Sequence, residues 1–248
     1  MTRGERLQKV LARSGAAASR RKAEALIEAG RVTIGGAVAS LGARVPPGAE
    51  VRVDGRVVPD ADRPVVLLLH KPRGVVSTAH DPQGRPTVME LVPRLPGLHT
   101  VGRLDADSEG LLLLTNDGAL TQRLAHPSFE HRKRYRAWCE PGTVAPSALR
   151  ALRQGVRLED GPARADEAWA APGGAVVELH EGRKRQVRRM LSEVGFPVVR
   201  LQRTRVGGLT LGRLPEGAWR EASEEERLRL GYDSDHVLRR RDRATEGP

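Results

Sequence analysis

The sequence contains a short loop in which two carboxylates lie between glycines. Asp105 and Asp107 stand between Gly102 and Gly110, and the apolar run Leu111–Leu114 follows directly. A loop held against a rigid strand is a common place for catalytic groups, and an ionised carboxylate there can act as a nucleophile or a base. Aspartates also form turns. The residues alone leave both interpretations open.

A second candidate is Tyr135, in the segment Arg132–Ala137. Side chains of a strand alternate between its two faces, so Tyr135 shares a face with Ala137 and Cys139, while Trp138 and the neighbouring arginines share the other. Tyr135 therefore points toward the interior, where it can stack on a ring or serve as plain core.

Residues 181–205 are strongly basic, with eight Lys or Arg against two Glu. At about 100° per residue, a helix here places apolar side chains on one buried stripe. Arg188 flanks that stripe, whereas Arg185 and Arg189 point away from it. We therefore expect Arg188 at the edge of a cleft. The other two face solvent or RNA, and a solvated basic face is the simpler alternative for each.

The overall charge favours a polyanionic partner. The 248 residues include 42 Lys plus Arg against 31 Asp plus Glu, a net charge of +11. The preference for Arg over Lys is typical of a GC-rich genome, but it does not explain the excess over acid. Because neutralising phosphates releases counterions, nucleic acid is the favoured partner.

Other classes of protein are not supported. No apolar run approaches the roughly 20 residues that cross a bilayer, and Met1–Arg6 opens no secretory signal. The single cysteine, Cys139, excludes an internal disulfide framework and a Cys-rich zinc site. We expect a soluble, cytoplasmic monomer without membrane contact.

Three regions must position these residues. Residues 1–60 predict a small domain with helices over 6–14 and 19–29 and two-residue hairpins at Gly35-Gly36 and Asp54-Gly55. Basic side chains at a helix start favour phosphate, although a solvated face is the alternative. The residues expected to contact RNA there are Lys9, Arg20, Arg21, Lys22 and Arg31. After a linker at Pro59–Arg63, we expect a second domain over 61–223, beginning with a buried strand at Val65–Leu69, and a charged tail over 224–248.

Two of these regions resemble known families. Residues 5–55 resemble the S4-like RNA-binding domain. Gly102–Asp105, with Gly110–Gly118 behind it, resembles the active-site signature of the RsuA/RluB branch of bacterial pseudouridine synthases. Further segments similar to that family are Lys71–Thr78, Arg132–Ala137 and Glu181–Leu191. The implied fold class is α+β, with a small S4-like domain and a catalytic domain whose mixed, mainly antiparallel sheet is flanked by helices.

The resemblance implies a role for each matching residue. Asp105 matches the essential carboxylate, Tyr135 the active-site tyrosine, and Arg188 an arginine that pairs with the carboxylate. Arg103 matches the arginine that helps to hold the target nucleotide out of its stack, whereas Asp107 matches nothing and is expected to be a loop residue. The residues assigned to phosphate contact are Arg183, Arg185 and Arg189.

The implied reaction is isomerisation of a uridine to pseudouridine in ribosomal RNA. It needs no cofactor and no metal, in agreement with the lack of Rossmann, Walker or zinc-ligand motifs. Asn116–Gly118 and Leu124–Ser128 look nearer to the large-subunit members of the family, which predicts a target near the peptidyl-transferase region and makes His126 a turn residue. Free RNA and a pre-ribosomal particle both remain possible substrates.

Two alternatives stay open beside this interpretation. One is a small-subunit pseudouridine synthase. The other is a non-catalytic RNA-binding protein of ribosome assembly, which the charge and the first domain suit equally well. The joint presence of Asp105, Tyr135 and Arg188 favours the enzyme, because a binding protein has no need of all three.

Overall fold

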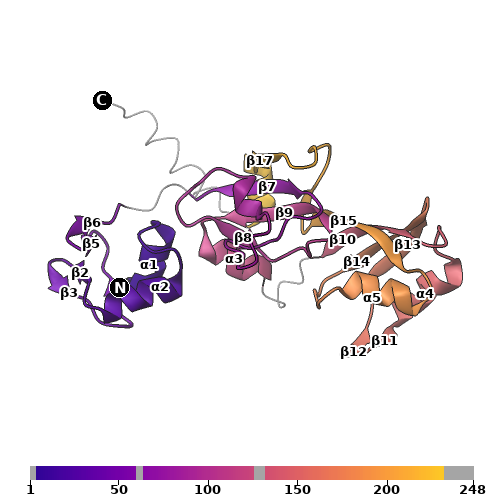
Figure 1. Cartoon of the computed structure of the whole chain (residues 1–248), viewed down its shortest axis with the longest axis horizontal. Coiled ribbons are helices and arrows are strands. Elements are labelled where there is room, and N and C mark those ends of the chain that lie inside the picture. The colour runs from indigo at the N-terminus through magenta and orange to yellow at the C-terminus, as the bar shows by residue number, and fades with distance from the viewer. Residues whose placement is uncertain (1–3, 60–63, 126–131, 232–248) are drawn as a thin grey trace. The chain divides into compact units, whose positions relative to one another are not determined.

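The computed structural model describes residues 4–59, 64–125 and 132–231 (Figure 1). The chain divides into two units, one made of residues 1–65, 94–99 and 115–118, the other of 66–93, 100–114 and 119–248. His126, most of the expected linker and the expected tail beyond residue 231 lie outside the described residues. The domain boundaries at residues 60 and 223 stay predictions.

The first unit packs two helices with short strands around one apolar core. Its elements are β1 (Glu5–Arg6), α1 (Leu7–Arg13), α2 (Arg20–Glu28), β2 (Val32–Ile34), β3 (Ala37–Val38), β4 (Arg44–Val45), β5 (Val51–Val53) and β6 (Arg56–Val57). Leu7 and Leu11 of α1 meet Ile27 of α2 and Val32 of β2 in the core. Ser19 caps α2, since its hydroxyl accepts a hydrogen bond from the Lys22 amide at 3.2 Å.

Both predicted hairpins are confirmed. Gly35 and Gly36, with φ of 56° and 87°, connect β2 to β3, and Asp54 and Gly55, with φ of 49° and 76°, connect β5 to β6. Positive φ at both turn positions matches the twist of the paired strands. The four strands form an antiparallel sheet in the order β3-β2-β5-β6.

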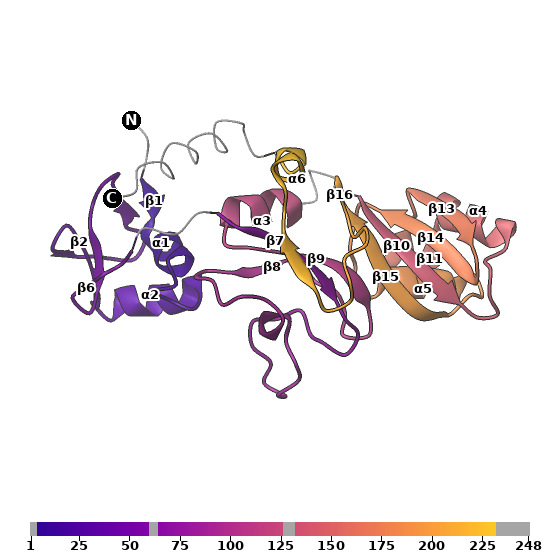
Figure 2. The same ribbon diagram turned by 90° about the horizontal axis from the view of Figure 1, so that it is seen from above.

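The second unit is built on one mixed sheet, so the expected α+β class is confirmed. Its strands are β7 (Val66–Lys71), β8 (His99–Val101), β9 (Glu109–Thr115), β10 (Lys133–Cys139), β13 (Glu167–Ala171), β14 (Gly174–Leu179), β15 (Val198–Val206), β16 (Leu209–Thr210) and β17 (Trp219–Glu221). The main order is β13-β14-β10-β15-β9-β7-β17, in which β15 and β9 are parallel and most other pairs are antiparallel (Figure 2).

Helices and a small ribbon flank this sheet. They are η1 (Val88–Glu90), α3 (Gly118–Ala125), α4 (Pro146–Gln154), α5 (Gln186–Glu193), α6 (Glu224–Arg229) and the paired strands β11 (Val156–Leu158) and β12 (Gly161–Ala163). Helix α4 packs on β13, and α5 packs on β15 and β11. Within the described residues, no helix combines the length and apolar character that a bilayer crossing requires.

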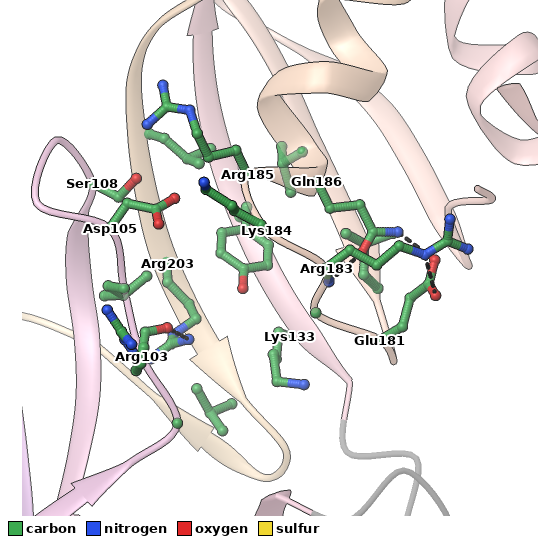
Figure 3. Close-up of a pocket in the computed structure, with 18 of the residues that line it drawn as sticks. Arg103, Asp105, Ser108, Lys133, Glu181, Arg183, Lys184, Arg185, Gln186 and Arg203 are labelled. Atoms are coloured by element: carbon green, nitrogen blue, oxygen red, sulfur yellow. Dashed lines mark hydrogen bonds and ion pairs between the residues drawn. The ribbon is translucent and has the colours of Figure 1, made fainter. Parts of the chain in front are cut away.

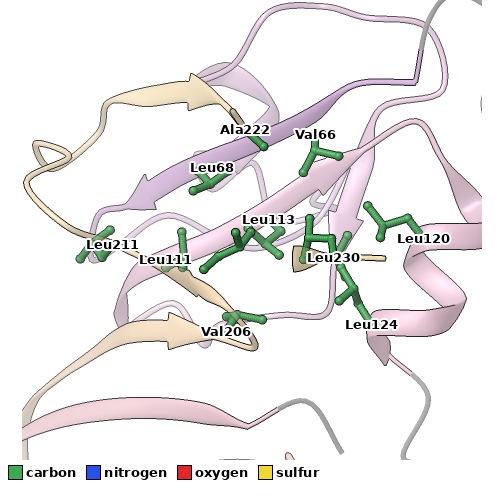
Figure 4. Close-up of a cluster of buried hydrophobic side chains, with 12 residues drawn as sticks. Val66, Leu68, Leu111, Leu113, Leu120, Leu124, Val206, Leu211, Ala222 and Leu230 are labelled. Carbon is green, nitrogen blue, oxygen red and sulfur yellow. The ribbon is translucent and has the colours of Figure 1, made fainter. Parts of the chain in front are cut away.

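The core of the second unit lies around β7 and β9, whose residues are all buried. Leu68 and Leu113 meet Leu120 of α3 and Leu230, which follows α6 (Figure 4). Residues 224–230 therefore pack with this unit, although the sequence assigns them to a charged tail. The contacts come from Arg227, which is buried within α6, and from Leu230, which joins the core.

Gly110 permits a close approach between two strands. It has φ of 108° and pairs with Arg203 across the parallel β9–β15 contact. A Cβ atom at this position would stand 2.3 Å from the Arg203 carbonyl oxygen. The parallel pairing that brings β15 beside the aspartate loop thus depends on a residue without a side chain.

We predict that Gly110→Ala destabilises the protein by roughly 3 kcal/mol or more, because strained φ and steric overlap with backbone act together. Gly84→Ala is the matched control, since Gly84 has φ of 69° but open space around its Cβ position. It should cost only the backbone strain, about 1 kcal/mol. Urea unfolding measures both values, and equal losses would contradict the steric argument.

Candidate active site

A cavity of about 750 Å³ lies in the second unit. It is bounded by the loop after β8, by β10 and β15, and by the segment that leads into α5 (Figure 3). The predicted residues that line it are Arg103, Asp105, Tyr135, Arg183 and Arg185. Arg188 and Arg189 are not among its lining residues. The structure thus gathers the candidate carboxylate and tyrosine into one space, from segments about 30 residues apart in the sequence.

Asp105 presents a free carboxylate to this cavity. Its side chain has no hydrogen bond or ion pair with any other residue that the structure describes, and it is exposed. In Figure 3 the ammonium group of Lys184 points toward it from the opposite wall. Tyr135 is only 9% exposed and shares the buried face of β10 with Ala137 and Cys139, as the alternation predicts.

The loop that carries Asp105 is fixed through its backbone. Six consecutive carbonyl oxygens, from Arg103 to Ser108, each accept a hydrogen bond. Arg203 Nη1 donates to the Arg103 oxygen (3.3 Å), Ser77 Oγ to Leu104 (2.8 Å) and the Ser108 amide to Asp105 (3.1 Å). The Gly74 amide donates to the Ala106 oxygen (2.7 Å), Arg188 Nη2 to Asp107 (2.9 Å) and Lys71 Nζ to Ser108 (2.8 Å). A loop without a free carbonyl in this stretch has little freedom to move. The side chain of Asp105 is therefore aimed by contacts that do not involve its carboxylate.

Lys71 is the most deeply buried of these donors. Its side chain is fully buried at the end of β7, and its ammonium also donates to the Pro72 carbonyl oxygen at 2.8 Å. Burial lowers the pKa of Lys71 to about 8, while the charges of Asp107 and Asp105 oppose that shift. The sequence analysis gave Lys71 no role. The similarity of Lys71–Thr78 to the family was the available signal for such a role, because this segment supplies three of the six donors.

Arg188 pairs with a different aspartate from the one expected. Its Nε lies 3.4 Å from Asp107 Oδ2, and its other nitrogens donate to the backbone oxygens of Asp107 and Val198 at 2.9 and 3.0 Å. The expected Asp105–Arg188 ion pair is absent among the described residues. The physical reason is that Asp105 faces the cavity, whereas the buried guanidinium of Arg188 lies against the backbone of the loop.

Asp107 is more than the loop residue that the sequence suggested. Arg185 binds both of its carboxylate oxygens, at 3.0 and 2.9 Å, and Arg188 adds a second charge. Burial opposes ionisation of Asp107, but these two arginines outweigh it and lower the pKa of the carboxyl group below its ordinary value. An ionised Asp107 thus ties the loop to the start of α5.

The arginines assigned to phosphate contact have carboxylate partners in this structure. These ion pairs are Arg183–Glu181, Arg185–Asp107 and Arg189–Asp160. Arg183 also donates to the Gly161 carbonyl oxygen at 3.3 Å, which fastens it to β12. All three therefore serve the fold, and contact with phosphate stays a prediction.

Of the basic residues that were predicted to contact RNA in the first unit, two have a carboxylate partner and three have none within the described chain. Lys9 lies 3.4 Å from Glu5, and Arg31 binds Asp54 through two nitrogens. Arg20, Arg21 and Lys22 are exposed at the start of α2 and have no ion pair within the described chain. These three are the ones available to an external anion, and their contact with RNA also stays a prediction.

Two further residues of the cavity were not singled out from the sequence. Arg203 of β15 is only 3% exposed, and Lys133 of β10 lies two residues before Tyr135. Alternation along each strand was the available signal, because it places Arg203 on the face of buried Leu201 and Lys133 on the face of Tyr135. The described residues contain no group of three or more side chains suited to hold a metal ion.

The chain is similar to known proteins over both units. Residues 65–193 match the family model for RNA pseudouridylate synthase, and residues 5–51 match the S4 domain. An uncharacterised RNA pseudouridine synthase of Mycobacterium tuberculosis is 50% identical over 236 residues, covering 90% of this chain and 92% of that protein. Ribosomal large subunit pseudouridine synthase B of Salmonella typhi is 46% identical over 231 residues, covering 88% and 79%.

A solved structure resembles this one as well. A crystal structure of a pseudouridylate synthase has 28% sequence identity and a TM-score of 0.65, and the match covers 92% of this chain and all of the other. The resemblance thus covers most of the chain.

We predict that the free energy of unfolding, compared between wild type and Lys71→Met, diverges as the pH rises from 8 to 10. The folded chain releases the Lys71 proton near pH 8, whereas the unfolded chain holds it to the ordinary pKa of 10.5. The unfolded state therefore binds more protons in this window, so wild type gains stability with rising pH relative to the variant. Urea titrations at several pH values measure this, and parallel profiles would contradict it.

Proposed function

We propose that this chain, which belongs to the RNA pseudouridylate synthase family and is an isomerase of uridine in RNA, acts on large-subunit ribosomal RNA with Asp105 as its catalytic carboxylate. The observation that carries the assignment of Asp105 is its position. It is the carboxylate in the cavity that has no partner in the described chain, on a loop whose carbonyl oxygens from Arg103 to Ser108 all accept hydrogen bonds.

The reaction exchanges one bond of the nucleoside for another. The bond from ribose C1′ to N1 of uracil breaks, the base turns, and C1′ joins C5, which loses a proton while N1 gains one. A carboxylate can assist either by attacking carbon or by removing a proton. Asp105 has the exposure that both routes require.

The neighbours of Asp105 fit the other demands of the reaction. A base inside a helix is out of reach, so the nucleotide must leave its stack at a cost of a few kcal/mol. Tyr135 offers a ring inside the cavity on which uracil can stack, and Arg103 is an exposed cation at its edge that can fill the gap in the RNA. Arg188 then acts through the loop, as a positioning residue.

The substrate is proposed from the relatives. Two of them, from Salmonella typhi and Pasteurella multocida, are named ribosomal large subunit pseudouridine synthase B, and each covers about nine tenths of this chain. An S4 domain adds phosphate contacts that give affinity without chemistry. The expectations of a monomer, a cytoplasmic location and a pre-ribosomal substrate stay predictions.

We predict that Asp105→Asn binds a large-subunit RNA transcript as wild type does but forms no detectable pseudouridine. The amide keeps the size of the side chain and removes the negative oxygen. Asp107→Asn is the informative comparison, because it weakens the loop contacts but leaves the carboxylate of Asp105 in place; it should retain measurable activity. Product formation by Asp105→Asn would refute the catalytic assignment.

Chemical mapping of pseudouridine on both ribosomal RNAs tests the substrate separately. After incubation with wild type, a single modified uridine in the large-subunit RNA is the expected result. Modification confined to the small-subunit RNA would refute the subunit assignment and leave the enzyme class intact.

We predict that Arg20→Glu combined with Arg21→Glu weakens RNA binding and reduces the dependence of affinity on salt by about two phosphate contacts. The matched control is Arg164→Glu with Arg213→Glu, which changes the charge equally at two exposed residues outside the cavity. Filter binding over a series of salt concentrations measures both. If the two double variants lose affinity equally, the first unit has no special role.

A further inference from the structure

One end of the cavity holds two cations, Lys133 and Arg203, that form no ion pair within the described chain. Arg203 is 3% exposed, yet no carboxylate of the described chain pairs with it; its guanidinium donates to the carbonyl oxygens of Leu111 and Arg103 at 2.8 and 3.3 Å. Buried charges are normally paired, because burial without a partner is costly. A cation that keeps this position while unpaired indicates that its counter-charge comes from outside the chain.

Lys133 lies close enough to Arg203 to feel its charge. Burial lowers the pKa of Lys133, and the positive charge of Arg203 lowers it further. The nearest partner of the Lys133 ammonium is the His180 carbonyl oxygen, at the long distance of 3.4 Å. In the view of Figure 3, Lys133, Arg203 and Arg103 lie toward the lower end of the cavity and Asp105 toward the upper.

The other cations near the cavity are paired with acids, bonded to the backbone or exposed to solvent. Arg185 has Asp107, Arg183 has Glu181, and Lys71 is held by two backbone oxygens. Arg103 and Lys184 also line the cavity without an acidic partner, but they are exposed to solvent, whereas Lys133 is partly buried and Arg203 is buried. The unpaired positive charge that is shielded from solvent is therefore concentrated at Lys133 and Arg203.

The framework around Lys133 is rigid. Strand β10 lies between β14 and β15, and Lys133 is paired with Leu179 on one side and Val206 on the other. Alternation puts its side chain on the same face as Tyr135, two residues and roughly 7 Å along the strand. An anion held by Lys133 would thus stand at a fixed distance from a base stacked on Tyr135.

We propose that Lys133 and Arg203 bind one phosphodiester group of the RNA, adjacent to the uridine that occupies the cavity. This inference rests on the proposed function for the identity of the anion, because RNA supplies phosphodiesters at regular spacing along its backbone. The phosphate neutralises both cations and fixes the nucleotide relative to Asp105. Lys133 and Arg203 are then residues that position the substrate.

The test uses the full chain with Asp105→Asn, so that RNA binds without reacting. In that background Lys133→Met should bind the large-subunit RNA transcript about tenfold to a hundredfold more weakly, since one charge-assisted hydrogen bond is lost. The dependence of log affinity on log salt should fall by about one. Lys133→Arg should recover most of the affinity, because it keeps the charge. Arg213→Gln, an exposed cation outside the cavity, is the control for charge alone.

A second measurement needs no change in the protein. RNA fragments that each carry one neutral methylphosphonate near the target uridine are bound to Asp105→Asn and to the double variant with Lys133→Met. At one position the substitution should weaken binding to the first protein and have little further effect on the second. Equal losses in both proteins at every position would overturn the proposal, as would equal effects of Lys133→Met and Arg213→Gln.

The result for the phosphate site can be distinguished from the result for the proposed function. If wild type forms no pseudouridine in the large-subunit transcript but the coupling between Lys133 and one phosphate is found, the phosphate site stands and the substrate assignment fails. If wild type forms the product and no phosphate is coupled to Lys133, the function stands and the site is refuted.

Discussion

The structure depends on one constraint, the complete bonding of the backbone carbonyls from Arg103 to Ser108. The carboxylate that we propose as catalytic needs a fixed direction, but bonds to the carboxylate itself would occupy the oxygens that must react. The fold meets both needs by holding the main chain and leaving the side chain of Asp105 free. Three of the six donors are charged side chains, whose hydrogen bonds are stronger than neutral ones.

Those donors come from distant parts of the chain, and the sheet explains how they meet. Lys71 ends β7, Arg203 lies on β15, and Arg188 follows on α5, which packs against β15. The parallel contact of β9 with β15 at Gly110 brings the last two to the loop. A side chain at Gly110 would separate the strands, so one missing Cβ atom supports the geometry of the whole site.

Much of this arrangement could be predicted from local patterns. Alternation along β10 placed Tyr135 inward, the apolar run placed β9 in the core, and turn residues located both hairpins. The choice of partners could not be predicted. Helical periodicity indicated that Arg188 is buried at an edge, but which aspartate it meets depends on the path of the loop, and two aspartates stand only two residues apart. The role of Lys71 likewise depends on where β7 ends relative to β9.

The excess of basic residues is used in two different ways, which composition cannot distinguish. One set, including Arg185 and Arg188, pairs with acids and builds the site. A second set, which includes the partly buried Lys133 and the buried Arg203, has no acid to pair with in the described chain. Unpaired charge inside a cavity destabilises the empty protein and is relieved when an anion enters. If an RNA phosphate binds there as proposed, part of its binding energy is stored in the fold before the RNA arrives.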